Sequence, residues 1–137
     1  MKVLITGGAG FIGSYLAENY LEQGDDVYIV DDLSTGTLEN IKHLQVDENH
    51  KDKLFVTIDS ILNHNVMLGL VGTCDIVLHM AAAVGVQYIL ENPLSSIVTN
   101  IKGTEEVLEL CNKFKKKVLI ASTSEVYGKH THAPLVE

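Results

Sequence analysis

The first thirteen residues constrain the fold of this chain more than any other stretch. Val3–Ile5 is an apolar run typical of a buried strand; a glycine cluster follows at Gly7, Gly10 and Gly13, and a helical pattern begins at Ile12. In such a strand, turn and helix, the first glycine turns the chain, the second lets the backbone approach a pyrophosphate, and the third lets the helix pack on the strand. The helix N-terminus offers unpaired N–H groups and a positive dipole end to phosphate. The segment predicts a dinucleotide site, although a plain strand-to-helix turn is the alternative.

Composition narrows the class of protein and its partners. With 137 residues, 46% of them hydrophobic, the chain is predicted to form one packed domain over residues 1–137. A net charge of −8 argues against nucleic acid or an anionic membrane as a partner. No arginine is present, so phosphate must be held by backbone N–H groups, hydroxyls or lysine. The absence of a signal-like segment or a run of about 18 apolar residues predicts a soluble cytoplasmic protein.

Apolar runs alternate with helical patterns along the rest of the chain. Helices are expected at 12–23, 38–44, 64–70 and 93–113, and four more strands at 27–30, 54–58, 75–80 and 117–121. This order predicts an α/β fold with a doubly wound parallel sheet and the strand order 3-2-1-4-5. Cys74 and Cys111 lie in apolar contexts and are interpreted as core residues of a reduced protein. His130 and His132 are too isolated to predict a metal site, and none is expected.

Asp31 is the candidate for recognition of the adenosine ribose. It ends the second strand and follows Gly13 by 18 residues, close to where dinucleotide folds place a carboxylate that accepts hydrogen bonds from the ribose hydroxyls. A carboxylate there would repel a 2′-phosphate, so NAD is favoured over NADP. The alternative is that Asp31 and Asp32 only cap the turn after the strand.

A run of small residues, from Ala81 to Gly85, follows the fourth strand. Small side chains at the carboxyl end of a parallel strand leave room for a flat group such as nicotinamide, although a tightly packed corner has the same composition. Asn100, in the helix that begins near Pro93, is placed to reach the strand ends, with an ordinary surface position as the alternative. Gly103 in the same helix predicts close packing.

With these residues in place, the chain resembles the extended short-chain dehydrogenase/reductases, in particular the nucleotide-sugar epimerases, dehydratases and decarboxylases. The resemblance rests on segments in the family's order: T-G-G-A-G-F-I-G-S at 6–14, D-D-L-S-T-G at 31–36, Asp59, H-M-A-A-A-V-G at 79–85, Asn100 with Gly103-Thr104, and S-T-S-E-V-Y-G at 122–128. The resemblance implies a Rossmann domain that binds NAD and a small nucleotide-sugar, in an enzyme that is a homodimer at full length.

The resemblance also assigns roles to individual residues. For the cofactor it implies that the glycine loop with Phe11 and Ile12 holds the pyrophosphate, that Asp31 holds the ribose, and that the adenosine side is flanked by Asp32, Leu33, Ser34, Thr35, Gly36, Asp59 and Ser60. The nicotinamide side is implied to be formed by Met80, Ala81, Ala82, Ala83 and Asn100. The substrate side is implied to include Val84, Gly85 and Ser124.

Thr123 matches the family's catalytic Ser/Thr, and Glu125 is the second candidate catalytic residue. In family members that perform hydride chemistry, a Tyr-x-x-x-Lys dyad supplies the base, because the lysine lowers the tyrosine pKa. No tyrosine in this sequence has a lysine four residues later; Tyr127, for example, is followed by Thr131. The chain is therefore interpreted as the amino-terminal half of such an enzyme, inactive by itself.

The residues after Thr123 bear on the reaction type. The family's dehydratases have Asp-Glu there, and the serine in Ser124-Glu125 cannot act as a carboxylic acid. The sequence predicts a UDP-sugar epimerase that uses NAD, with a UDP-glucuronate decarboxylase as the first alternative. A non-catalytic NAD-binding module is the second alternative.

Overall fold

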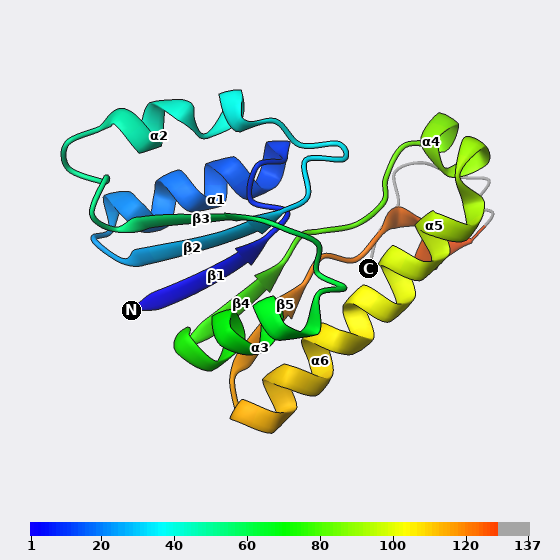
Figure 1. Ribbon diagram of the computed structural model, residues 1–137. Helices are drawn as coiled ribbons and strands as arrows, with labels where there is room; N and C mark the ends of the chain where they lie inside the picture. The colour runs from blue at the N-terminus through cyan, green and yellow to red at the C-terminus, as the bar shows by residue number, and fades with distance from the viewer. Residues whose placement is uncertain (129–137) are drawn as a thin grey trace.

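The computed structural model has a five-stranded parallel sheet in the order β3-β2-β1-β4-β5 (Figure 1). The structure describes residues 1–128, without the side chains of residues 86, 88, 124 and 125. The strands are β1 (Lys2–Thr6), β2 (Asp26–Asp31), β3 (Leu54–Ile58), β4 (Ile76–His79) and β5 (Lys117–Ile120). The strand order predicted from the sequence is confirmed.

Helices cover both faces of the sheet, α1 (Phe11–Glu22) and α2 (Lys42–Val46) on one face, α3 (His64–Thr73) and α6 (Gly103–Phe114) on the other (Figure 1). The remaining helical segments are η1 (Leu38–Asn40), α4 (Val86–Glu91), α5 (Pro93–Ile97), the π-helical η2 (Val98–Lys102) and the 3₁₀ turn η3 (Ser124–Tyr127). Three details differ from the expectations of the sequence. Helix α4 was not predicted, the helix expected at 93–113 contains a π segment, and the helix expected at 38–44 is split into η1 and α2. Within the described residues, no helix is long and apolar enough to cross a membrane.

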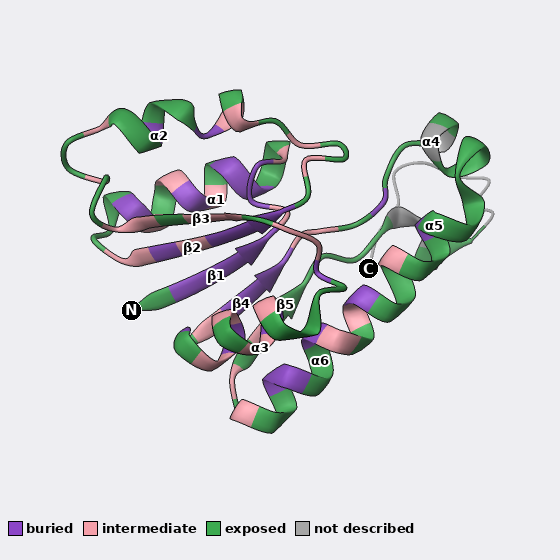
Figure 2. Ribbon diagram, in the orientation of Figure 1, coloured by how far each residue is buried: buried purple, intermediate pink, exposed green. Residues whose placement is uncertain are grey.

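The sheet has a core on each face because successive side chains of a strand point to opposite sides. In β1, Val3 and Ile5 pack toward α1 and α2, whereas Leu4 packs toward α3 and α6. The central strands are therefore buried on both sides, while exposed residues lie on the outer surfaces of the helices (Figure 2). This two-sided burial explains why the strands read as continuous apolar runs in the sequence.

The two cysteines belong to the core between the sheet and helices α3 and α6. Both are free thiols, and burial raises the pKa of Cys74 to about 12. A thiol that stays protonated at neutral pH is a poor nucleophile and a poor metal ligand. The interpretation of the cysteines as core residues is confirmed.

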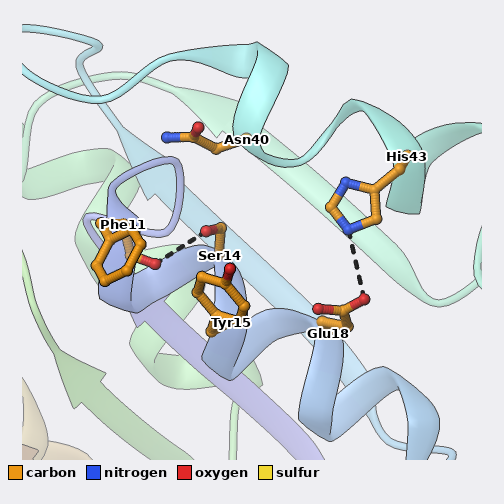
Figure 3. A pocket seen from close by; sticks show the side chains of 6 residues that line it. All are labelled: Phe11, Ser14, Tyr15, Glu18, Asn40 and His43. Atoms are coloured by element: carbon orange, nitrogen blue, oxygen red, sulfur yellow. Dashed lines mark hydrogen bonds and ion pairs between the residues drawn. The ribbon is translucent and has the colours of Figure 1, made fainter.

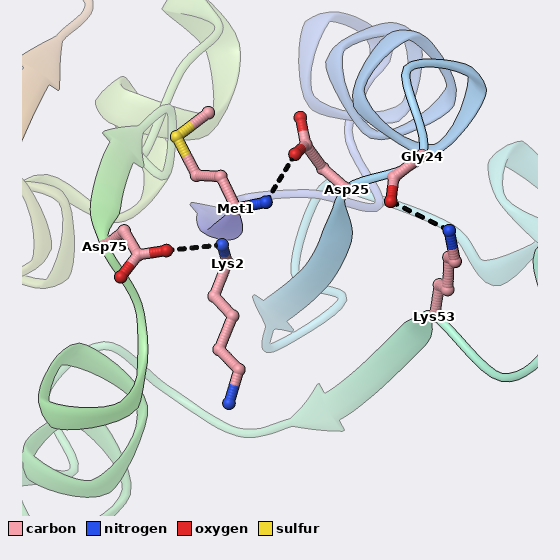
Figure 4. Close-up of polar contacts among 6 residues, drawn as sticks. All are labelled: Met1, Lys2, Gly24, Asp25, Lys53 and Asp75. Carbon is pink, nitrogen blue, oxygen red and sulfur yellow. Dashed lines mark hydrogen bonds and ion pairs between the residues drawn. The ribbon is translucent and has the colours of Figure 1, made fainter.

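Polar contacts fix the amino end of the sheet (Figure 4). The N-terminal ammonium group lies 2.6 Å from Asp25 Oδ1, and the Lys2 backbone N–H donates to Asp75 Oδ2 at 2.7 Å. Lys53 Nζ donates to the Gly24 carbonyl at 2.8 Å. These contacts tie together the starts of neighbouring strands, and the loops that carry the candidate site emerge at the opposite, carboxyl edge.

Candidate functional site

The glycine loop joins β1 to α1 at the carboxyl edge of the sheet. Gly7 has a φ of 70°, a left-handed conformation that favours glycine, and its N–H donates to the Val30 carbonyl at 2.8 Å. A Cβ on Gly7 would lie 2.8 Å from Ala81 Cα, and a Cβ on Gly13 would lie 2.2 Å from the Gly7 carbonyl oxygen. The turn at Gly7 and the close packing at Gly13 are confirmed, and their role toward a phosphate stays a prediction.

The N-terminus of α1 is open to an anion. Gly10 is the N-cap and offers no side-chain cap, and the first intrahelical bond runs from the Ser14 N–H to the Gly10 carbonyl at 3.0 Å. The N–H groups of Phe11, Ile12 and Gly13 precede that bond and have no acceptor within the helix. Three converging donors, without a competing carboxylate in the first turn, fit a pyrophosphate.

Asp31 connects the end of β2 to the glycine loop. Its Oδ2 accepts the Ala9 N–H at 2.9 Å, its Oδ1 accepts the Leu33 N–H at 2.9 Å, and the residue is 8% exposed. The turn-capping role considered for Asp31 is therefore present. It does not exclude ribose binding, because an ionised carboxylate has about four lone-pair sites and two are used here. Asp32 caps the same turn by accepting the Ser34 N–H at 3.0 Å.

The turn after β2, residues 32–36, packs against the glycine loop. The Ala9 carbonyl accepts the Thr37 N–H at 3.1 Å and Asn40 Nδ2 at 2.8 Å. A Cβ on Gly36 would lie 2.9 Å from the Ala9 carbonyl carbon, so only glycine fits that position. Leu33 has a φ of 59°, an unusual conformation for a bulky residue and one that tends to occur at functional sites.

Asp59 and Ser60 follow β3, beside the end of β2. The Asp59 N–H donates to the Asp31 carbonyl at 3.2 Å, which brings the two predicted adenosine-side segments together. The Asp59 carboxylate accepts the Ser60 N–H at 2.7 Å and Asn63 Nδ2 at 3.1 Å. The structure thus places Asp59 and Ser60 at the same sheet edge as Asp31, and their contact with adenine stays a prediction.

The loop after β4, residues 80–85, is held by Asn100 from the π-helical segment η2. Asn100 Oδ1 accepts the Ala83 N–H at 2.7 Å, and Asn100 Nδ2 donates to the Ala83 carbonyl at 3.2 Å. Asn100 thus reaches the loop that leaves β4, while the residue itself is exposed, as the alternative of a surface position had it. Ala83 is buried, whereas Ala82, Val84 and Gly85 are exposed and Met80 and Ala81 are half-buried. Gly85, at φ 96°, ends the loop before α4.

The candidate catalytic residues follow β5, which pairs with β4. The Ala121 N–H donates to the His79 carbonyl at 3.2 Å, so Thr123 emerges at the same edge as the loop after β4. The Thr123 carbonyl accepts the Val126 N–H at 3.3 Å in the turn η3. The side chains of Ser124 and Glu125, and the histidines at 130 and 132, lie outside the part of the chain that the structure describes.

A hollow of about 420 Å³ lies between α1 and the segment of η1 and α2, with Phe11 and Asn40 at its end nearest the glycine loop (Figure 3). Its wall includes the edge-to-face pair of Phe11 and Tyr15, with ring centroids 5.3 Å apart, and the ion pair between His43 Nε2 and Glu18 at 3.5 Å. The Phe11 side chain is 76% exposed. The Phe11 ring therefore lines this hollow, whereas its backbone N–H belongs to the N-terminus of α1.

Sequence reasoning missed several residues that build the site. Ala9 and Asn40 join the glycine loop to the turn after β2, and Thr6, His79 and Thr104 form a hydrogen-bonded polar group beside the loop after β4. Only His79 carried a usable signal, because a histidine that ends an apolar strand needs hydrogen-bond partners.

These features define a Rossmann-type α/β fold, in which a glycine loop, an acidic strand end and a small-residue loop meet at the carboxyl edge of a parallel sheet. The model of the GDP-mannose 4,6 dehydratase family matches residues 4–137. The chain therefore belongs to this family of extended short-chain dehydrogenase/reductases.

Relatives within the family perform different reactions. The chain is 45% identical to a UDP-N-acetyl-alpha-D-glucosaminuronate decarboxylase of Bacillus cytotoxicus, over 95% of this chain and 39% of the relative. It is 34% identical to a putative UDP-glucose 4-epimerase of Methanocaldococcus jannaschii, over 98% of this chain and 42% of the relative. A UDP-glucose-4-epimerase structure from Stenotrophomonas maltophila, with bound NAD and formylated UDP-arabinopyranose, is similar with a TM-score of 0.85 at 29% identity, covering 98% of this chain and 40% of that one. The chain spans about two fifths of the length of these proteins.

Proposed function

We propose that this chain is the NAD-binding portion of an enzyme that converts a UDP-sugar by transient hydride transfer, with epimerisation as the first candidate reaction. The observation that carries the proposal is the bond between the Ala9 N–H and Asp31 Oδ2, at 2.9 Å. It holds the loop suited to a pyrophosphate directly against the carboxylate suited to a ribose. The decarboxylase and epimerase relatives support the same class of substrate.

The residues present fit NAD, which supplies the hydride acceptor when bound. The N–H groups of Phe11, Ile12 and Gly13 would hold the pyrophosphate, and the two free lone-pair sites of Asp31 would accept the ribose hydroxyls. The turn 32–36 with Asp59 and Ser60 would border the adenosine. The loop 80–83, with Asn100, would border the nicotinamide.

Thr123 would orient the sugar by hydrogen-bonding the hydroxyl that is oxidised, and Glu125 would lie beside it. Val84, Gly85 and Ser124 would line the sugar side. The hydroxyl proton must pass to a base as the hydride leaves, and no tyrosine of this sequence has the paired lysine that would lower its pKa. The base would therefore come from residues outside this sequence.

Decarboxylation is the second candidate reaction, favoured by the 45% identity to a decarboxylase and by Ser124-Glu125. Oxidation of the hydroxyl on the carbon β to a sugar carboxylate gives a β-keto acid, which loses CO₂. The epimerase reaction instead returns the hydride to the opposite face of the ketone. The two reactions share the hydride step and differ in whether the substrate carries a carboxylate.

We expect the 137-residue chain to show no turnover of UDP-glucose, UDP-galactose or UDP-glucuronate. Without a tyrosine and lysine base, the rate enhancement from general base catalysis, roughly 10²–10⁴-fold, is lost along with substrate positioning. Product formation is followed by chromatography, with protein from a host lacking its own epimerase. Turnover would contradict the missing-base argument, and the product formed would then identify the reaction.

The cofactor preference is the more direct test of binding. We expect the chain to bind NADH more tightly than NADPH. Asp31→Asn should weaken NADH binding by about 1–3 kcal/mol and reduce the ratio of NADH to NADPH affinity. Calorimetry measures both affinities. Asp47→Asn is the matched control, because the Asp47 carboxylate also accepts a backbone N–H, from Asn49 at 2.8 Å, but lies outside the site. Equal affinity of the wild-type chain for both cofactors, or no binding of either, would contradict the proposal.

A further inference from the structure

Three polar side chains form a row at the carboxyl end of β1 and β4, two of them buried and the third, Thr104, half-buried. His79, which is 3% exposed, has its Nδ1 at 2.7 Å from Thr6 Oγ1 and its Nε2 at 3.1 Å from Thr104 Oγ1. Thr6 is also buried, and Thr104 comes from the first turn of α6. The row crosses from the sheet to the helix directly beneath the loop 80–83.

The hydrogen bonds of this row run in one direction only. The Thr104 hydroxyl donates to the Asn100 carbonyl at 2.7 Å, so it has no second proton and must accept from His79 Nε2–H. Burial lowers the pKa of His79, which favours the neutral ring. Nδ1 is then an acceptor, and Thr6 donates to it. The Thr6 oxygen in turn accepts the Ala81 N–H at 3.1 Å.

The row closes into a ring through the loop itself. At one end the ring reaches the loop at Ala81, through Thr6. At the other end it reaches the Asn100 carbonyl, and the Asn100 side chain bonds both backbone groups of Ala83. His79 joins the Thr6 side of this ring to the Thr104 side, because its Nδ1 bonds Thr6 and its Nε2 bonds Thr104.

The π-helical segment η2 is where this ring meets the helix. Such segments are rare and often occur at functional sites. A threonine hydroxyl that bonds the carbonyl four residues earlier tends to bend a helix, and Thr104 bonds Asn100 in this way. The geometry of the helix at Asn100 is thus coupled to the same histidine.

We propose that His79, acting through Thr104, is a positioning residue that fixes the loop 80–83 and Asn100 against each other to form the nicotinamide side of the site. The inference rests on the proposed function. A buried histidine with both nitrogens bonded does not contact the cofactor, and it acts by holding the groups that do.

The test removes the hydrogen bond between His79 and Thr104, which lies on the side of the ring away from Ala81. Thr104→Val keeps the shape of the side chain and leaves His79 Nε2–H without its acceptor. We expect it to weaken NADH binding by about tenfold, the equivalent of one hydrogen bond, and to leave the affinity for ADP-ribose within about twofold, because ADP-ribose lacks the nicotinamide. Thr104→Ser restores the hydroxyl and is expected to restore NADH binding.

Thr73→Val is the matched control, since Thr73 Oγ1 donates to the Gly69 carbonyl at 2.8 Å in the same kind of bond, far from the site. Equal NADH affinity of Thr104→Val and wild type would overturn the proposal. An equal loss of affinity for ADP-ribose would also overturn it, because the effect would then be a general destabilisation of the chain. If wild type binds neither ligand, the proposed function fails instead.

A second measurement does not depend on a ligand, and its first part uses only the wild-type chain. The ¹⁵N spectrum of the His79 ring in the wild-type chain at pH 7 is expected to show a protonated Nε2 and an unprotonated Nδ1. Thr104→Val is expected to shift the Nε2 signal, and Thr73→Val is not. A protonated Nδ1 in the wild type would break the direction of the ring and overturn the inference.

Discussion

Gly13→Ala is expected to destabilise the fold by about 3 kcal/mol or more. The added Cβ would lie 2.2 Å from the Gly7 carbonyl oxygen and 2.7 Å from Gly8 Cα, both backbone atoms that a rotamer change cannot move. Overpacking of this kind typically costs about 1–3 kcal/mol, and more where the neighbour is rigid. The helix must move away from β1, so the N–H groups that would hold the pyrophosphate also move. The melting temperature of the variant should be lower than that of the wild type by about 10 °C or more.

Gly69→Ala is the matched control for this substitution. Gly69 lies in the interior of helix α3, is exposed, and has no atom within 4 Å of the position that a Cβ would take. Alanine there should stabilise the chain by up to about 1 kcal/mol through helix propensity alone. A Gly13→Ala melt equal to wild type would show that the close approach of helix and strand is not required.

Much of this architecture could be predicted because local patterns agree with the final fold. The apolar strands are buried on both faces, and the glycine spacing around Gly7 and Gly13 places helix α1 on the sheet. Gly103 was expected to allow close packing, and a Cβ there would lie 2.3 Å from Ile61 Cδ1. In each case, the residue's own geometry or periodicity carries the information.

The remaining features depend on contacts between distant segments. The dual bond of Asn100 to Ala83 requires the π segment, and no periodicity marks that segment inside a helical pattern. Helix α4 has only six residues, Val86–Glu91, and such a short stretch is too brief to show a helical period in the sequence. The ring through His79 joins residues from β1, β4 and α6, which the fold alone brings together.

The predicted roles divide along the sheet edge. The proposed adenosine side draws on the loops after β1, β2 and β3, which bond one another through Ala9, Asp31 and Asp59. The proposed nicotinamide and sugar sides draw on the loops after β4 and β5, where Asn100 holds the first loop and Thr123 lies on the second. Under the proposed function, adenosine binding and the residues that would choose the reaction thus come from different strands.

We expect the 137-residue chain to self-associate, in line with the homo-oligomer predicted from the sequence. Large apolar side chains are exposed on α5 and η2, where Leu94 is 79% and Ile101 63% exposed, and on the edge strand β5, where Leu119 is 53% exposed. Apolar area of a few hundred Å², at about 25 cal/mol per Å², amounts to several kcal/mol, comparable to the stability of a whole domain. An edge strand also offers unpaired backbone groups to another chain.

Sedimentation measurements across a dilution series show which of these two surfaces mediates the association. If the helix face dominates, Leu94→Lys with Ile101→Lys should yield a monomer at concentrations where the wild type is associated. If the strand edge dominates, Leu119→Lys should do so instead, because a charge on an edge strand opposes pairing. Val46→Lys, at an equally exposed apolar residue of α2, should change neither outcome. A wild-type monomer at several hundred micromolar would contradict the expectation, since burial of either surface would then be too weak to offset the entropy lost on association.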